Sequence, residues 1–387
     1  MPDDLLLPEG ARLVHIGPQK TGTTSIQVAM AEARDAMGAH GAYYPSGDHR
    51  RRRAGWALGL PGGPRDTPIE HWEELVAEVR AAGPVRVCVS DENFARAEPA
   101  VVERIVRDLG GDRVHVVATA RRLDRFLPSQ WQERVKARIG TGAGFEEWLT
   151  EVLDDGPGYS WERWNVWMGH DVAGLVRRWV DVVGEDRFTL VVADEADRSQ
   201  LTTLFEAMLG LPSGTLQLHP DRSNEGFGLA EVELLRRLKH ILEQNEQSSD
   251  QLRTVVRSAV RRYIASRPDR APGPRHAPIP AWAMARIREL SDRRADAVSA
   301  LGVRVVGDPE SLRVPADLPA DEVDLGDLTV PLELAAGAIV AAVEREKRMS
   351  AVTAARRLSG DQAASDLSGR ELLAMAVRRA RARLRRS

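Results

Sequence analysis

The stretch from residue 12 to residue 27 limits the fold and the chemistry of this chain more than any other part. The apolar run Arg12 to Ile16 is followed by a polar turn with Gly17 and Gly22 at its two ends, and then by a helical pattern. This is the G-x-x-x-x-G spacing of a phosphate-binding loop, in which backbone N–H groups and a helix N-terminus hold phosphate oxygens. The pattern predicts a strand, a phosphate-binding turn and a helix, in that order.

The lysine of this loop does not stand where a nucleotide-hydrolysing enzyme needs it. Such loops carry Lys and then Ser or Thr directly after the second glycine, for the terminal phosphates and Mg²⁺. Here Thr23 and Thr24 hold those positions, and Lys20 lies inside the loop. A P-loop kinase or nucleotidase with an altered loop is therefore the weaker interpretation, and it requires ATP turnover that depends on Mg²⁺.

A second segment carries groups suited to phosphate. The β-branched run Arg113 to Thr119 leads to Arg121, and Ser129 opens an amphipathic stretch eight residues later. A guanidinium offers phosphate a bidentate fork, and a hydroxyl near a helix start adds one donor. Taken singly, the two residues would be a surface arginine and a helix cap. Their occurrence after the loop, in this order, favours a second phosphate contact.

Together the two segments resemble the sulfotransferases that use PAPS, 3′-phosphoadenosine 5′-phosphosulfate. The motif P-x-K-T-G-T-T-S at residues 18–25 is similar to the loop that binds the 5′-phosphosulfate in that family, and Arg121 with Ser129 matches the pair that binds the 3′-phosphate. Arg122 stands where the family often has proline. The resemblance covers roughly residues 10–315 and implies that PAPS is bound by Gln19, Lys20, Thr21, Gly22, Thr23, Thr24, Ser25, Arg121 and Ser129.

Sulfuryl transfer also needs a cation and a base. Charge builds on the bridging oxygen of the departing nucleotide, and Lys20 is placed to neutralise it. Two residues are candidates for the base that takes the acceptor's proton. Glu92 lies where the resemblance places the catalytic histidine of cytosolic relatives, and His49 lies where glycan-modifying relatives have a catalytic glutamate. Asp91 is a third choice.

Each candidate base also has an ordinary interpretation. Partial desolvation would raise the pKa of Glu92 toward a useful range, but a carboxylate at a helix start is common. The ordinary pKa of histidine, about 6.5, suits the task, but His49 stands beside the basic run Arg50 to Arg53 and could be a surface residue. The sequence leaves the choice open.

Strand-like and helical runs alternate through the first half of the chain. This order predicts an α/β fold with a central parallel β-sheet flanked by helices, and the resemblance implies the P-loop NTPase-like sulfotransferase fold. Ligands of such sheets bind at the carboxyl ends of strands, where both phosphate segments fall. The expected strands are Arg12–Ile16, Val85–Val89, Arg113–Thr119 and Arg187–Val192, and the expected helices include Ser25–Met37, His71–Ala82, Pro99–Leu109, Phe126–Ile139 and Val172–Val183.

The chain divides into a sulfotransferase domain, residues 1–315, and a helical, arginine-rich extension, residues 316–387. The proline-dense segment Ser266 to Pro280 predicts a loop or linker. Within the extension, helical patterns cover Val330 to Arg348 and Gly369 to Arg386. The second of these could contact a membrane surface or an anionic partner, although a solvated terminal helix is the simpler interpretation. A degenerate sulfotransferase fold that only binds its partner is a further alternative.

The composition limits the kinds of partner that we expect this protein to bind. The formal charge of −3 gives no overall attraction to a nucleic acid polymer, and the single cysteine, Cys88, lies in an apolar run and reads as a core residue. No run approaches the about 18 to 20 apolar residues that span a bilayer, and no secretion signal is apparent, so we expect a cytoplasmic protein. The abundance of Ala, Arg and Gly is typical of bacterial GC-rich coding. No cluster of metal-ligating residues is apparent, so no metal is expected.

The sequence gives the least information about the site that binds the acceptor. Tryptophans at residues 131, 148, 161, 164 and 167 surround the glycine-marked stretch Gly140 to Gly158 and could line an apolar acceptor pocket, although tryptophans more often pack a core. The acceptor would be a hydroxyl or amine of a small-molecule, carbohydrate or lipid-linked compound. The oligomeric state stays open.

Overall fold

The computed structural model of the protein describes residues 5–45, 48–64, 66–137, 142–218, 226–244, 250–267, 269, 271, 273–318 and 328–359. Among these residues, six parallel strands form one sheet in the order β2-β3-β1-β4-β5-β6. The strands are β1 (Arg12–Gly17), β2 (Ala42–Tyr43), β3 (Arg86–Ser90), β4 (Val114–Ala120), β5 (Phe188–Val192) and β6 (Arg304–Val306). The predicted α/β class with a central parallel sheet is confirmed.

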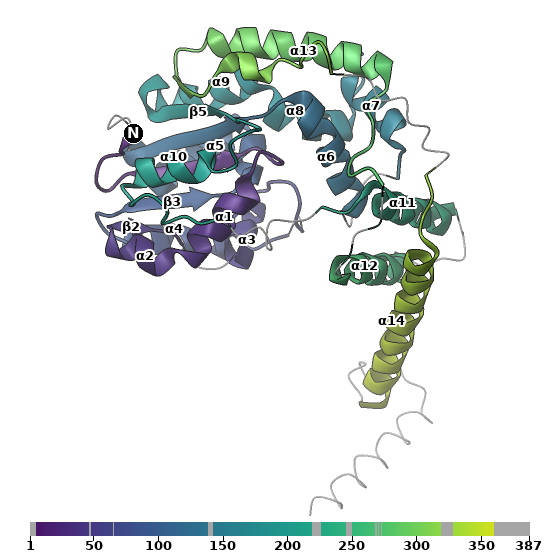
Figure 1. The fold of residues 1–387 in the computed structure, drawn as a ribbon. Coiled ribbons are helices and arrows are strands. Elements are labelled where there is room, and N and C mark those ends of the chain that lie inside the picture. Colours follow the sequence, from purple (N-terminus) through teal and green to yellow (C-terminus); the bar gives the residue numbers. More distant parts are fainter. Residues whose placement is uncertain are drawn as a thin grey trace, which may run out of the picture. The chain divides into compact units, whose positions relative to one another are not determined.

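Helices cover both faces of this sheet (Figure 1). Alternation along β1 shows why: Leu13 packs into one core cluster, and its neighbour Val14 packs into the other. The cluster around Leu13 includes side chains of α1 (Thr23–Glu32), α2 (Arg34–Ala39) and α10 (Gln200–Leu209). The cluster around Val14 includes side chains of α3 (Asp48–Ala57), α4 (Glu70–Ala81), α5 (Pro99–Leu109), α9 (Val172–Val183) and α13 (Ala281–Ser299).

Other predicted elements need correction. The helix predicted over residues 25–37 is two helices, α1 and α2. The glycine-marked stretch at residues 140–158, where no helix was predicted, contains helix α7 (Phe145–Leu153), whose first side chain, Phe145, lies in the core. The short edge strands β2 and β6 were not predicted from the sequence. The remaining helices are α6 (Leu123–Lys136), α7 (Phe145–Leu153) and α8 (Trp161–His170), with short 3-10 turns η2 (Glu92–Arg96), η3 (Gly111–Arg113), η4 (Glu185–Arg187) and η5 (Pro309–Leu312).

The chain forms two compact units whose residues interleave along the sequence. The first, residues 1–133, 143–226 and 276–323, contains the sheet. The second, residues 134–142, 227–275 and 324–387, contains α11 (Leu229–Gln244), α12 (Asp250–Ser266) and α14 (Leu332–Ser359). The structure thus groups α11 and α12 with α14, whereas the sequence analysis put the boundary at residue 315. That functional boundary stays a prediction.

Within the second unit, α12 and α14 pack against each other. The Tyr263 hydroxyl on α12 donates a hydrogen bond to the Glu333 carbonyl on α14, with 3.3 Å between the oxygens. The predicted arginine-rich helix at residues 369–386 lies outside the described residues. None of the described helices has the length and apolar character that crossing a membrane requires.

Candidate functional site

The strand order places both predicted phosphate segments at one point of the sheet. β1 has β3 on one side and β4 on the other, so the chain order reverses around it. Ligands of open parallel sheets bind outside the carboxyl ends of strands at such a reversal. The turn at residues 18–22 follows β1, and Arg121 follows β4 directly. The topology therefore brings these two segments together.

The turn after β1 has an internally braced backbone. The hydroxyls of Thr21 and Thr23 are buried and donate to the carbonyl of Pro18, at 2.6 and 3.3 Å. Lys20 has φ +64° and Gly22 has φ +95°, both in the left-handed region. Left-handed residues in a turn help successive backbone N–H groups converge on an anion. Helix α1 then starts at Thr23 without a side-chain cap.

The two glycines that bound this turn have positive φ angles, of +79° at Gly17 and +95° at Gly22, and close neighbours, so a side chain at either position would be strained. A Cβ on Gly17 would lie 3.0 Å from Glu92 Cα, and one on Gly22 would lie 2.8 Å from Leu201 Cδ1. The first contact also shows that the end of β1, where the turn begins, lies directly against Glu92, the second residue after β3. Glu92 and the turn are thus neighbours at the carboxyl edge of the sheet.

The side chain of Arg121 contacts the backbone of the turn. Its Nη1 donates to the carbonyl of Lys20 at 3.1 Å. The carbonyl of Arg121 in turn accepts from Nη1 of the buried Arg294, at 3.0 Å. Further along, in α6, Gln130 Nε2 lies 3.4 Å from Gln19 Oε1. These contacts join the end of β4 and the middle of α6 to the turn.

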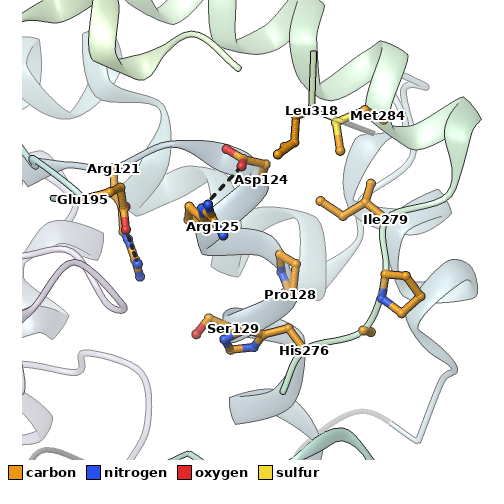
Figure 2. Close-up of a pocket in the computed structure, with 12 residues that line it drawn as sticks. Arg121, Asp124, Arg125, Pro128, Ser129, Glu195, His276, Ile279, Met284 and Leu318 are labelled. Atoms are coloured by element: carbon orange, nitrogen blue, oxygen red, sulfur yellow. Dashed lines mark hydrogen bonds and ion pairs between the residues drawn. The ribbon is translucent and has the colours of Figure 1, made fainter. Parts of the chain in front are cut away.

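A cavity of about 430 Å³ lies beside Arg121. Figure 2 shows Arg121 and Glu195 at one side of it, and Ile279, Met284 and Leu318 at the other. Ser129, which is half-buried, also lines it. The turn itself does not line this cavity, but Arg121, which donates a hydrogen bond to the Lys20 carbonyl of the turn, does. The remaining lining residues are Asp124, Arg125, Pro128, His276, Ala277 and Pro278.

Arg121 and Arg122 have different surroundings. Asp124, which is buried, accepts two hydrogen bonds from Arg122, at 2.9 and 2.6 Å, and these bonds raise the pKa of Arg122. Arg121 lines the cavity, and Arg122 does not. The geometry therefore favours Arg121 as the residue that could meet a ligand there.

Both predicted phosphate cations carry a carboxylate partner in this structure. Nε and Nη2 of Arg121 donate to the two carboxylate oxygens of Glu195, at 2.6 and 2.8 Å (Figure 2). Lys20 Nζ lies 3.0 Å from Oε1 of Glu133 on α6. The two ion pairs neutralise the charges that the sequence analysis assigns to phosphate.

Glu92 has surroundings that suit a base. It is the first residue of η2, and its side chain is half-buried. Burial raises its pKa, the nearby charges of Arg96 and Lys20 lower it, and the net direction is upward. A carboxylate with a raised pKa next to a lysine can accept a proton at a pH where an ordinary glutamate is a weaker base.

Its neighbour Asp91 is more deeply buried. Its Oδ1 accepts from the backbone N–H of Asn93 at 2.9 Å and caps η2. Its Oδ2 is buried and has no hydrogen-bond partner among the described residues. Burial raises the pKa of Asp91 to about 7. The depth of this carboxyl makes it a poorer candidate than Glu92 for contact with an acceptor.

Thr24 and Ser25 lie in the first turn of α1, directly after the phosphate turn, and neither lines the cavity. His49 lies in α3, and its side chain is outside the described part of the chain. Thr24 is exposed and Ser25 is half-buried. Trp131 and Trp148 are fully buried, and none of the five clustered tryptophans lines the cavity, so packing explains Trp131 and Trp148 better than an acceptor pocket does.

Several residues of the cavity and its surroundings were not predicted from the sequence. Arg125 and Glu133 lie one turn before and one turn after Ser129 on α6, so the four-residue spacing could have indicated them. No spacing or motif in the sequence indicated Glu195 or His276. His276 comes from the proline-dense segment, which supplies one wall of the cavity rather than acting only as a linker. The described residues include no group of His, Cys, Asp and Glu that could hold a metal ion.

Comparison with known proteins adds a partial likeness. A crystal structure of a sulfotransferase from Alicyclobacillus acidocaldarius is similar to this chain with 19% sequence identity and a TM-score of 0.37, over 55% of this chain and 87% of that one. No protein-family model and no curated protein matches the chain. Its function is therefore inferred from its own residues.

Proposed function

We propose that this chain is a sulfotransferase that takes a sulfuryl group from PAPS and releases 3′-phosphoadenosine 5′-phosphate. The hydrogen bond from Arg121 Nη1 to the Lys20 carbonyl, 3.1 Å long, is the observation that carries this proposal. It joins the strand-end guanidinium to the turn whose sequence resembles a 5′-phosphosulfate loop. A ligand with phosphates on the 3′ and 5′ positions of one ribose could therefore reach both.

The cavity suits the nucleoside part of such a ligand. Its volume of about 430 Å³ falls within the range of about 300 to 1,000 Å³ that is typical of small-molecule sites. Its charged side would take the 3′-phosphate on Arg121 and Ser129, with Arg125 as a further cation. The apolar side chains of Ile279 and Met284 would then face the adenine. Arg125 is half-exposed, and its ion pair with Asp124 is long, at 3.7 Å.

The reaction needs a leaving group, an attacking group and a proton acceptor. The S–O bond to the 5′-phosphate breaks, and a new bond forms from sulfur to a hydroxyl oxygen or amine nitrogen of the acceptor. Lys20 would neutralise the charge that grows on the bridging oxygen. Glu92 would take the acceptor's proton, since its raised pKa suits a base, and His49 remains the alternative. The remaining loop residues, Gln19, Thr21, Gly22, Thr23, Thr24 and Ser25, would surround the 5′-phosphosulfate, with no metal required.

The acceptor would be a small-molecule, carbohydrate or lipid-linked compound. Incubating the protein with PAPS labelled in its sulfuryl group and with extracts of its host would identify the class from the labelled product.

Titration with 3′-phosphoadenosine 5′-phosphate tests the proposal. We expect binding without Mg²⁺, and we expect Arg121→Lys to weaken it about tenfold or more, because lysine lacks the bidentate fork. Arg122→Lys is the matched control, since Arg122 is held by Asp124 and does not line the cavity. Absence of nucleotide binding at millimolar concentration would overturn the proposal, and turnover of ATP with Mg²⁺ would support the kinase alternative instead.

A further inference from the structure

We propose that Glu195 is a displaceable counter-ion built into the phosphate site, and that a ligand's phosphate must replace it on Arg121. This inference rests on the proposed function and concerns which anions the site admits. Its consequence is that Glu195 weakens binding of every anion and selects for ligands that carry phosphate at both ends of the site.

The Arg121 guanidinium has its binding edge filled. The two oxygens of Glu195 accept from Nε and Nη2, and Nη1 donates to the Lys20 carbonyl. The edge formed by Nε and Nη2 is the fork that binds carboxylate or phosphate through two parallel hydrogen bonds. A phosphate that binds this fork therefore has to move the carboxylate away.

The connection between β5 and α10 keeps Glu195 beside Arg121. Asp194 Oδ1 accepts from the N–H of Ala196 at 2.8 Å, and Asp197 Oδ1 accepts from the N–H of Ser199 at 2.8 Å. Gln200 Oε1 accepts from the N–H of Asp194 at 2.9 Å. The backbone on both sides of Glu195 is thus held by hydrogen bonds, while the side chain itself can leave.

Partial exposure makes this departure inexpensive. The side chains of Arg121 and Glu195 are 27% and 30% exposed, so water can solvate the carboxylate once it is displaced. Ion pairs with this degree of exposure contribute little net free energy, whereas a phosphate brings more negative charge to the same fork. The pair is therefore strong enough to compete with a weak anion and weak enough to yield to a phosphate.

The second cation shows the same arrangement. Lys20 Nζ is paired with Glu133 at 3.0 Å, and these side chains are 26% and 41% exposed. The two cations and two carboxylates sum to zero charge. A ligand with one phosphate can neutralise one cation only, but a ligand with phosphates on both the 3′ and the 5′ position can displace both carboxylates. The arrangement favours the doubly phosphorylated nucleotide over its singly phosphorylated relatives.

Calorimetric titration of Glu195→Gln tests this role, with 3′-phosphoadenosine 5′-phosphate and, separately, with inorganic phosphate at constant ionic strength. Glutamine keeps the size and one acceptor oxygen but removes the charge. We expect both ligands to bind about two- to fivefold more tightly, which is the span for removing one partly exposed competing ion pair. Asp197→Asn is the matched control, because it makes the same charge change in the same connection, keeps its acceptor oxygen and does not touch Arg121.

Each outcome bears on the inference. Equal or weaker nucleotide binding by Glu195→Gln, with wild-type binding intact, would overturn it and leave the proposed function standing, since Glu195 would then orient Arg121 rather than compete for it. Tighter binding of inorganic phosphate alone, with no nucleotide binding by either protein, would uphold the counter-ion and overturn the proposed function. Binding of neither ligand to either protein would overturn both, and an equal gain in Asp197→Asn would show a general charge effect instead.

Discussion

Replacing Asp91 with asparagine is expected to stabilise the protein progressively as the pH rises from 5 to 8. Asp91 is 3% exposed, and burial raises its pKa from 3.8 to about 7. Its Oδ2 has no hydrogen-bond partner among the described residues, and a Cβ on Gly55 would lie 2.5 Å from that oxygen, so α3 closes over it. Asparagine keeps the oxygen that accepts from the N–H of Asn93.

The sign and size follow from the two pKa values. Because the folded-state pKa is raised, the folded protein holds a proton that the unfolded chain has already released. The resulting stabilisation is fully present below about pH 4 and is lost as the pH rises through 7. Integrating the two titrations between pH 5 and pH 8 gives a loss of about 2 to 3 kcal/mol in the free energy of unfolding, which the asparagine variant does not suffer.

Urea unfolding of both proteins at pH 5, 6, 7 and 8 measures this difference. The free energy of unfolding of Asp91→Asn minus that of the wild type should grow by about 2 to 3 kcal/mol over this range. Asp108→Asn is the control: although burial raises the pKa of Asp108, hydrogen bonds from Trp72 and Arg107 lower it overall. Its stabilisation is complete above pH 4 and is lost only at lower pH, so its difference should be flat. A flat difference for Asp91→Asn would refute the reasoning, because it would show an ionised, hydrated carboxylate.

Two further predictions concern the edge of the sheet where β1 and β3 end. Glu92→Gln should lower the rate of sulfuryl transfer from PAPS about 10²- to 10⁴-fold, because it removes the proposed base. The Kd for 3′-phosphoadenosine 5′-phosphate should not change, because Glu92 is not among the residues proposed to contact the nucleotide. An unchanged rate, with the same loss in His49→Gln, would move the base to His49. Gly17→Ala should lower the free energy of unfolding by about 1 to 3 kcal/mol, since φ is +79° and Glu92 Cα lies 3.0 Å from the new Cβ. Gly38→Ala, with open space in α2, should be neutral or stabilising, and equal denaturation curves for the two variants would contradict this account.

The core of the sheet could be predicted because its signals are local. The four strands β1, β3, β4 and β5 are apolar runs of five to seven residues, and each lies within about one residue of its predicted bounds. β2 and β6 have two and three residues, which is too short for alternation to be visible. Their place in the sheet depends on pairing with β3 and β5, and pairing is a relation between distant segments.

The candidate site was only partly predictable, for the same reason. The glycine spacing of the turn and the position of Arg121 at a strand end can be recognised from residues close together in the sequence. The carboxylate partners are not: Glu195 is 74 residues from Arg121, and Glu133 is 113 residues from Lys20. The wall formed by His276 and Ile279 likewise comes from a segment whose prolines indicate only an irregular backbone.

From its sequence alone, this chain specifies a parallel α/β sheet with a glycine-bounded turn after its first strand and an arginine after a later one, because backbone conformation responds to residues a few positions apart. Only the tertiary structure decided that the arginine touches the turn and that both cations are neutralised by glutamates. It also decided that Asp91 is buried and that its Oδ2 has no hydrogen-bond partner within the described part of the chain. Those properties depend on distances through space and on exclusion of water, which no short stretch of sequence determines.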